Sequence, residues 1–111
     1  MLDVVNRLKA DLFKAISHPT RIQILEYLRG GERCVCEVIE ELELEQSNVS
    51  QHLGILKKQD LVAARKEGTK MMYRLKHPEV MDVMDLASRL LDRQLDETRE
   101  ALHFIRKNNE L

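Results

Sequence analysis

The chain has 111 residues, of which 33% are charged, with 18 basic and 19 acidic side chains and a formal net charge of −1. This length allows one modest hydrophobic core, and the near-neutral total leaves a nucleic-acid partner open. No apolar run approaches the ~20 residues of a membrane span and the N-terminus lacks the form of a signal peptide, which predicts a cytoplasmic protein without a membrane partner.

The distribution of charge is more informative than its total. Residues 46–76 carry seven Lys and Arg against two acids, whereas residues 32–45 carry six acids against one Arg. A cationic block of this kind attracts phosphates. Any nucleic-acid contact is therefore expected between residues 46 and 76.

Two amphipathic helices are predicted at the start of the chain. The first is marked by apolar residues at helical spacing, namely Leu2, Val5, Leu8, Leu12 and Ile16. Pro19 suits the first position of a second helix, PTRIQILEYL, which Gly30 and Gly31 end. The residues predicted to face inward in this second helix are Ile22, Leu25 and Leu28.

A helix-turn-helix is predicted over residues 35–58. A short third helix carries Val35, Val38, Ile39 and Leu42, and about four residues join it to a fourth helix, Gln46–Lys58. The apolar stripe of the fourth helix consists of Val49, Leu53 and Leu56. Glu45 stands at its cap position, where Ser, Thr or Asp is more usual.

The other face of the fourth helix is polar and predicts contacts with a major groove. Short hydrogen-bonding side chains near the helix start read base edges, and cations near its end hold phosphates. The same pattern also fits an amphipathic helix with a solvated face, so the neighbouring elements must decide. The residues concerned are Gln46, Ser47, Asn48, Ser50, Gln51, Lys57 and Lys58.

Residues 61–75 predict a β-hairpin, since two short extended runs flank a charged turn with Gly68 at its tip. Directly after a helix-turn-helix such a hairpin is a wing. Arg65, Lys66 and Lys70 are then expected over the phosphates or the adjacent minor groove. A solvated hairpin without a DNA contact is the alternative.

The last predicted helix starts at Pro78 and has no break before Asn108. Roughly thirty helical residues span ~45 Å, more than so small a domain can cover. Its excess apolar face predicts a homodimer. In such a dimer the two copies of the fourth helix, which we call the reading helix, lie ~34 Å apart, and this spacing predicts a palindromic DNA site. We therefore expect a single domain over residues 1–111, with residues 1–17 and 78–108 as dimerisation helices.

The residues 10–76 resemble the ArsR/SmtB group of winged-helix repressors, which sense metals and other effectors. The resemblance rests on the motifs LFKAISHPTRIQILEYL, ERCVCEVIEEL and QSNVSQHLGILKKQDLV. It implies a mainly α fold of order α-α-α-α-β-β-α, and a dimer that binds double-stranded operator DNA without a cofactor until an inducer releases it. It also places Gln46, Ser47, Ser50, Gln51 and His52 in the groove, although His52 lies between Val49 and Leu53 and could instead pack.

The segment ERCVCEV resembles the arsenic-responsive branch of this group, which predicts As(III) or Sb(III) bound at Cys34 and Cys36. Both thiols lie at a helix N-terminus, where the dipole favours thiolate, and thiolates select soft ions. The third cysteine of that branch is replaced here by Ile39. A small thiol or water could complete the site, or oxidation or sulfuration of the pair could be the signal. A disulfide between two cysteines separated by one residue would be strained and easily reversed. A further alternative is that both cysteines are buried small apolar side chains without a regulatory role.

Other sites and classes are disfavoured by the pattern. On the last helix Asp92 is followed by Gln94, and His103 is followed by Arg106, so the zinc motif of the group is absent. No cysteine precedes Cys34, which excludes the four-thiolate site of the cadmium and lead branch. An enzyme of the thiol oxidoreductase class is disfavoured because the pair is C-x-C rather than C-x-x-C. A helical dimerisation module with an incidental basic hairpin remains as a third class.

Overall fold

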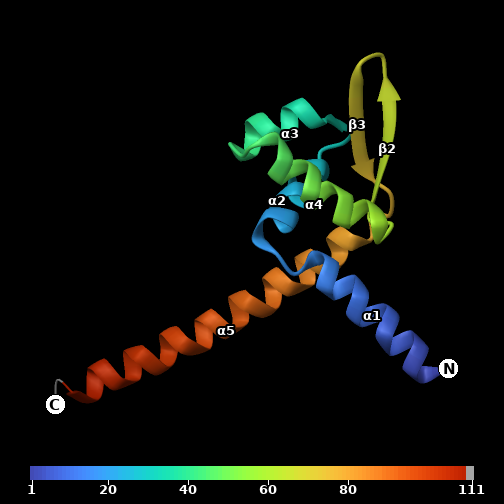
Figure 1. The fold of residues 1–111 in the computed structure, drawn as a ribbon. Coiled ribbons are helices and arrows are strands. Elements are labelled where there is room, and N and C mark those ends of the chain that lie inside the picture. Colours follow the sequence, from blue (N-terminus) through green and yellow to red (C-terminus); the bar gives the residue numbers. More distant parts are fainter. Residues whose placement is uncertain (110–111) are drawn as a thin grey trace. The chain divides into compact units, whose positions relative to one another are not determined.

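The computed structural model describes residues 1–109, which form a mainly helical protein with a small antiparallel sheet (Figure 1). The predicted winged helix-turn-helix class is confirmed. The chain forms two compact units, Met1–Pro78 and the part from Glu79 onward, and each is described by itself. In chain order the elements are α1 (Leu2–Ile16), α2 (Pro19–Leu28), β1 (Arg33–Cys34), α3 (Val35–Leu42), α4 (Gln46–Lys58), β2 (Val62–Glu67), β3 (Lys70–Leu75) and α5 (Val80–Asn109).

The core of the first unit lies where α2, α3 and α4 pack on one another. Val49, Leu53 and Leu56 are fully buried, which confirms the predicted stripe of α4. Spacings of four and three residues return to the same side of a helix, so these three side chains reach the core together. The other fully buried side chains are Ile24, Leu25, Leu28, Val38 and Val62.

The inward face predicted for α2 was wrong at one position. Ile22 is 38% exposed, whereas Ile24 is fully buried. Residues 22 and 28 are six apart, which places them about 120° from each other around a helix of 3.6 residues per turn. The core therefore takes Ile24 with Leu25 and Leu28, and Ile22 is left at the edge.

The start of α2 follows local capping rules, whereas the start of α4 does not. Pro19 occupies the first turn of α2, and His18 caps this helix by accepting the Thr20 backbone N–H on Nδ1 at 3.1 Å. Glu45 is the N-cap residue of α4 but makes no side-chain capping bond. The last helix begins at Val80 instead of at Pro78 because residues 78–79 form a turn, in which the Glu79 carbonyl accepts from Asp82.

The sheet has the strand order β1-β3-β2 and is antiparallel throughout. Strands β2 and β3 form the predicted hairpin, with Gly68 at φ 62° in its turn, a backbone angle that glycine adopts without strain. Strand β1 was not predicted, because two residues are too short to show alternation. It pairs Arg33 with Tyr73 and Cys34 with Met72.

Helix α5 leaves large apolar side chains uncovered in its own unit, and Leu91, Leu95, Leu102 and Ile105 form a stripe within about 80° of one another. Seven of its large apolar side chains are between 49 and 66% exposed: Leu86, Leu90, Leu91, Leu95, Leu102, Phe104 and Ile105. The N-terminal half of α1 also leaves Leu2, Val4 and Leu8 exposed. Among the described residues, no helix combines the length and the apolar content that a membrane crossing needs.

Candidate DNA interface and cysteine pair

Helix α4 presents a polar face on the side away from its buried stripe. Seven of the eight residues predicted for the groove from this helix are exposed, and these are Gln46, Ser47, Asn48, Ser50, Gln51, Lys57 and Lys58. At 100° per residue, Ser47, Gln51 and Lys58 point most directly away from the core. This face thus offers hydrogen-bonding groups and cations together.

Gly54 is a residue of this face that sequence reasoning missed. It lies in the interior of α4, where glycine costs about 0.5–1 kcal/mol relative to alanine. A Cβ built on Gly54 would meet nothing within 4 Å, so packing within the described chain does not require glycine here. An unexplained glycine inside an otherwise regular helix was the available signal.

His52, the eighth predicted residue, is half-buried and contacts α2. Its ring centroid lies 4.4 Å from that of His18, and its Nδ1 lies 3.3 Å from Arg21 Nη1. Arg21 also donates through Nε to the Ala15 carbonyl at 2.6 Å. Burial, followed by the charges of His18 and Arg21, lowers the pKa of His52. His52 therefore joins α4 to the start of α2, and its contact with DNA stays a prediction.

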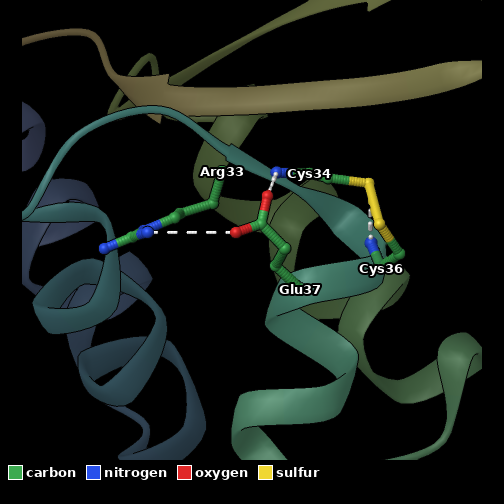
Figure 2. Close-up of a disulfide and its surroundings, with 4 residues drawn as sticks. All are labelled: Arg33, Cys34, Cys36 and Glu37. Atoms are coloured by element: carbon green, nitrogen blue, oxygen red, sulfur yellow. Dashed lines mark hydrogen bonds and ion pairs between the residues drawn. A yellow bond between two sulfur atoms is a disulfide. The ribbon is translucent and has the colours of Figure 1, made fainter.

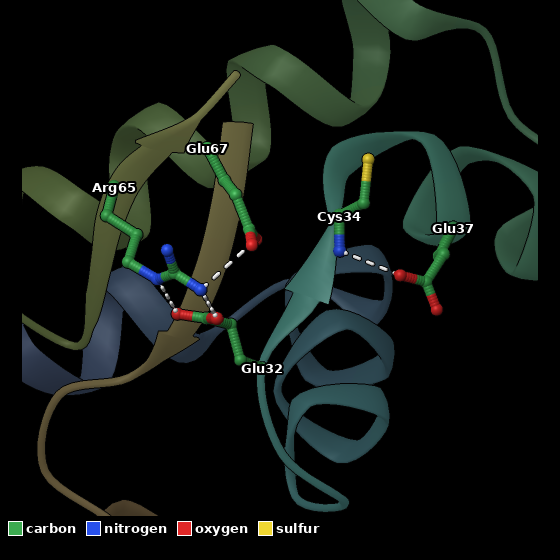
Figure 3. Close-up of polar contacts among 5 residues, drawn as sticks. All are labelled: Glu32, Cys34, Glu37, Arg65 and Glu67. Carbon is green, nitrogen blue, oxygen red and sulfur yellow. Dashed lines mark hydrogen bonds and ion pairs between the residues drawn. The ribbon is translucent and has the colours of Figure 1, made fainter. Parts of the chain in front are cut away.

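The three predicted wing residues, Arg65, Lys66 and Lys70, are exposed on the β2–β3 hairpin. Arg65 is held by carboxylates, as Figure 3 shows. It donates from Nε and Nη2 to the two oxygens of Glu32 at 2.8 and 2.6 Å, and from Nη2 to Glu67 at 3.2 Å. The Arg65 hydrogen bond holds the pKa of Glu32 below its usual range, and Glu32 in turn raises the pKa of Arg65.

Cys34 and Cys36 are joined by a disulfide at the junction of β1 and α3, with their Cα atoms 5.1 Å apart (Figure 2). Cys34 is 3% exposed, whereas Cys36 is exposed. Any reagent therefore meets Cys36 first. Within residues 1–109, no group of three or more His, Cys, Asp or Glu side chains lies in metal-binding geometry, so the pair contributes two sulfur ligands.

Cys34 is also the N-cap of α3. Its Sγ accepts the Cys36 backbone N–H at 3.1 Å, and Glu37 Oε1 accepts the Cys34 N–H at 3.0 Å, which together form a capping box. Glu37 further lies 3.8 Å from Arg33 Nη1, and the Arg33 guanidinium lies over the Tyr27 ring at 4.7 Å. The sulfur chemistry of Cys34 is therefore tied to the start of a helix that packs on α4.

A helix-turn-helix followed by a hairpin with exposed cations defines a winged helix-turn-helix DNA-binding protein. The profile described as "Bacterial regulatory protein, arsR family" matches residues 18–64. The uncharacterized HTH-type transcriptional regulator Rv0081 of Mycobacterium tuberculosis is 39% identical over 101 residues, covering 90% of this chain and 89% of that protein. The chain belongs to the ArsR family, and it is a DNA-binding transcriptional repressor rather than an enzyme.

Solved structures and a further relative agree with this family. The crystal structure of Rv0081 has a TM-score of 0.77 over 84% of this chain and 94% of that chain, at 39% identity. The homodimeric winged helix-turn-helix domain Mb0332 from Mycobacterium bovis has a TM-score of 0.76 over 86% and 88%, at 30% identity. An arsenical resistance operon repressor from Staphylococcus xylosus is 38% identical over 74 residues, covering 67% of this chain and 70% of the relative.

Proposed function

We propose that this chain acts in the cytoplasm as a homodimeric repressor that a thiol-reactive inducer releases from a palindromic operator. The inducer is As(III) or Sb(III) bound at Cys34 and Cys36. The observation that carries this proposal is the position of the Cys34 sulfur, which caps α3 at its N-terminus while α3 packs against α4. A change at this sulfur would alter α3, the helix against which the reading helix α4 packs.

The proposed DNA surface combines the polar face of α4 with the wing. Gln46, Ser47, Asn48, Ser50 and Gln51 read base edges, with His52 at the border of this face. Lys57 and the wing cations Arg65, Lys66 and Lys70 bind phosphates. Because phosphate contacts release counterions, operator affinity should fall steeply with salt.

The proposed dimer uses residues 1–17 and 78–108. The exposed apolar side chains of α1 and α5 support this role, since an uncovered apolar stripe of this length favours association. A relative whose solved structure is described as homodimeric supports it further. A two-fold dimer presents two copies of α4 and predicts a palindromic site.

The inducer reaction needs both sulfurs as thiols. Arsenous acid would lose two hydroxyl groups, which leave as water with the two thiol protons, while two As–S bonds form. The third position keeps a hydroxyl group or takes a small thiol. The similarity of this chain to an arsenical resistance operon repressor supports the choice of a metalloid as the inducer.

A second candidate is a sensor of oxidation or of reactive sulfur, and the bonded state of Cys34 and Cys36 supports it. Two thiols and one hydrogen peroxide would give the disulfide and two waters. This chemistry uses the same sulfurs as As(III), so the two inducers are mutually exclusive at any moment. A repressor that does not respond through these cysteines is the remaining alternative.

One titration distinguishes these candidates. As(III), Cd(II), hydrogen peroxide and a persulfide donor are added separately to the reduced protein bound to fluorescent operator DNA, and dissociation is followed by anisotropy. The proposal expects As(III) to release the DNA at near-stoichiometric concentration. Release by peroxide or persulfide alone would support the second candidate, and no release by any of them would contradict both.

A further inference from the structure

The bond between Arg65 and Glu32 connects the wing to the cysteine pair. Glu32 lies two residues before Cys34, directly ahead of strand β1. Met72 of β3 pairs with Cys34 on one side and with Arg65 on the other. Cys34, Met72 and Arg65 thus occupy one row across the three strands. Glu32 reaches Arg65 from the segment before β1 (Figure 3).

The Arg65 guanidinium has one of its edges occupied by carboxylates in this arrangement. Its Nε and Nη2 groups, which form the bidentate edge of the fork, face the carboxylates of Glu32 and Glu67. The two carboxylates of Glu32 and Glu67 thus surround the Arg65 guanidinium, and Arg74 also acts electrostatically on Glu32. A phosphate would have to displace Glu32 and would also meet its charge.

Glu32 is connected to Cys34 through strand β1. Strand β1 has two residues and ends at Cys34, which is at once paired with Met72 and the cap of α3. Chemistry at Cys34 therefore takes place two residues along the chain from Glu32. Here the two sulfurs are tied together and Arg65 is masked.

We propose that Glu32 masks Arg65 from the DNA phosphates when Cys34 and Cys36 are tied together, so that the cysteine pair acts on the wing as well as on the reading helix. The tie is either a direct bond or an As(III) bridge. This inference rests on the proposed function, because it assumes that the cysteines receive the inducer. Glu32 is a positioning residue, since it acts on DNA only through Arg65.

The test compares operator affinity of the reduced and the As(III)-loaded protein in three forms: wild type, Glu32→Gln and Glu67→Gln. The ratio of the two affinities is the release factor. Glu32→Gln should lower this factor by about 2- to 30-fold, chiefly by raising the affinity of the loaded protein. Glu67→Gln removes the same charge beside Arg65 but lies on the wing itself, so it should change both affinities alike and leave the release factor unchanged.

Two further measurements test whether Glu32 acts through Arg65. In an Arg65→Ala background, Glu32→Gln should no longer alter the release factor. With As(III) bound, the fall of log affinity with log salt should be less steep by about one in wild type than in Glu32→Gln, because wild type lacks one phosphate contact. The exposed ion pair contributes little to stability, so these variants should fold, which circular dichroism checks.

The outcomes separate the two proposals. An equal change of the release factor in Glu32→Gln and Glu67→Gln would overturn the masking, as would an effect of Glu32→Gln that persists without Arg65. A wild-type protein that As(III) does not release would instead overturn the proposed function. In that case the salt slopes of reduced and glutathione-disulfide-oxidised protein still test the masking, since oxidation of the two thiols reduces one glutathione disulfide to two glutathiones.

Discussion

Cys34 and Cys36 are connected by a backbone contact as well as by their sulfurs, because the Cys34 Sγ accepts the Cys36 N–H at 3.1 Å. One atom therefore serves both as a reactive group and as the cap of α3. Reaction at this sulfur changes its strength as an acceptor, since a thiolate accepts hydrogen bonds more strongly than a neutral sulfur does. Covalent chemistry at the Cys34 sulfur therefore changes the stability of α3.

The first prediction concerns this cap. In the reduced protein, Cys34→Ala should lower the free energy of unfolding by about 1–2 kcal/mol, because both a cap and a buried side chain are lost. Cys34→Ser should lose less, since serine is a good N-cap. Urea denaturation under reducing conditions measures both. Equal stability of the alanine and serine variants would show that the sulfur does not cap α3 in solution.

The second prediction concerns Gly54. Gly54→Ala should raise the free energy of unfolding by about 0.5–1 kcal/mol, because alanine favours the helix and its Cβ meets nothing. Operator affinity should nevertheless fall, since the added methyl group lies on the face that we assign to the groove. Thermal denaturation and anisotropy measure the two effects. A more stable variant with unchanged affinity would remove Gly54 from the DNA interface.

The predictable part of the fold was the part encoded locally. The bounds of α1, α2, α3 and α4 follow from apolar spacing and from Pro19, which act within a few residues. The bond between Glu32 and Arg65 joins residues 33 positions apart, and no local pattern encodes it. Arg65 was predicted as a phosphate contact because it is basic and on a hairpin, and sequence alone did not reveal the carboxylates that surround it.

The His52 contacts show the same limit. Sequence left open whether this histidine faces DNA or packs, since it lies beside the buried stripe of α4. Its packing partner His18 is distant in sequence and is itself the cap of α2. The candidate DNA residues on α4 were predictable because a buried stripe defines its opposite face.

The third prediction concerns pH. The pKa of His52 is lowered in the folded protein from its ordinary value of 6.5, so the unfolded chain binds more protons just below that value. This contribution to stability is present above pH 6.5 and is lost as the pH falls toward the folded pKa. Denaturation from pH 7.5 to 5 should therefore show a decline that is smaller in His52→Gln. An equal decline in wild type and His52→Gln would contradict this prediction.

The fourth prediction concerns the dimer. Leu95 is 52% exposed on the apolar stripe of α5, so Leu95→Gln should raise the dimer dissociation constant by at least about tenfold. Two-fold symmetry makes each substitution act twice. Glu100→Gln places the same side chain about 140° around α5 from Leu95, outside the stripe of Leu91, Leu95, Leu102 and Ile105, and should leave the constant unchanged. Sedimentation measures both, and equal behaviour of the two variants would reassign the interface.

The central claim is that the cysteine pair controls the reading helix. The most direct measurement follows the anisotropy of fluorescent operator bound to the reduced wild type or to the Cys34→Ser/Cys36→Ser variant while As(III) is added. We expect both proteins to bind the operator with similar affinity, because serine retains the cap, and only the wild type to be released. Release of the double variant at the same As(III) concentration would contradict the claim.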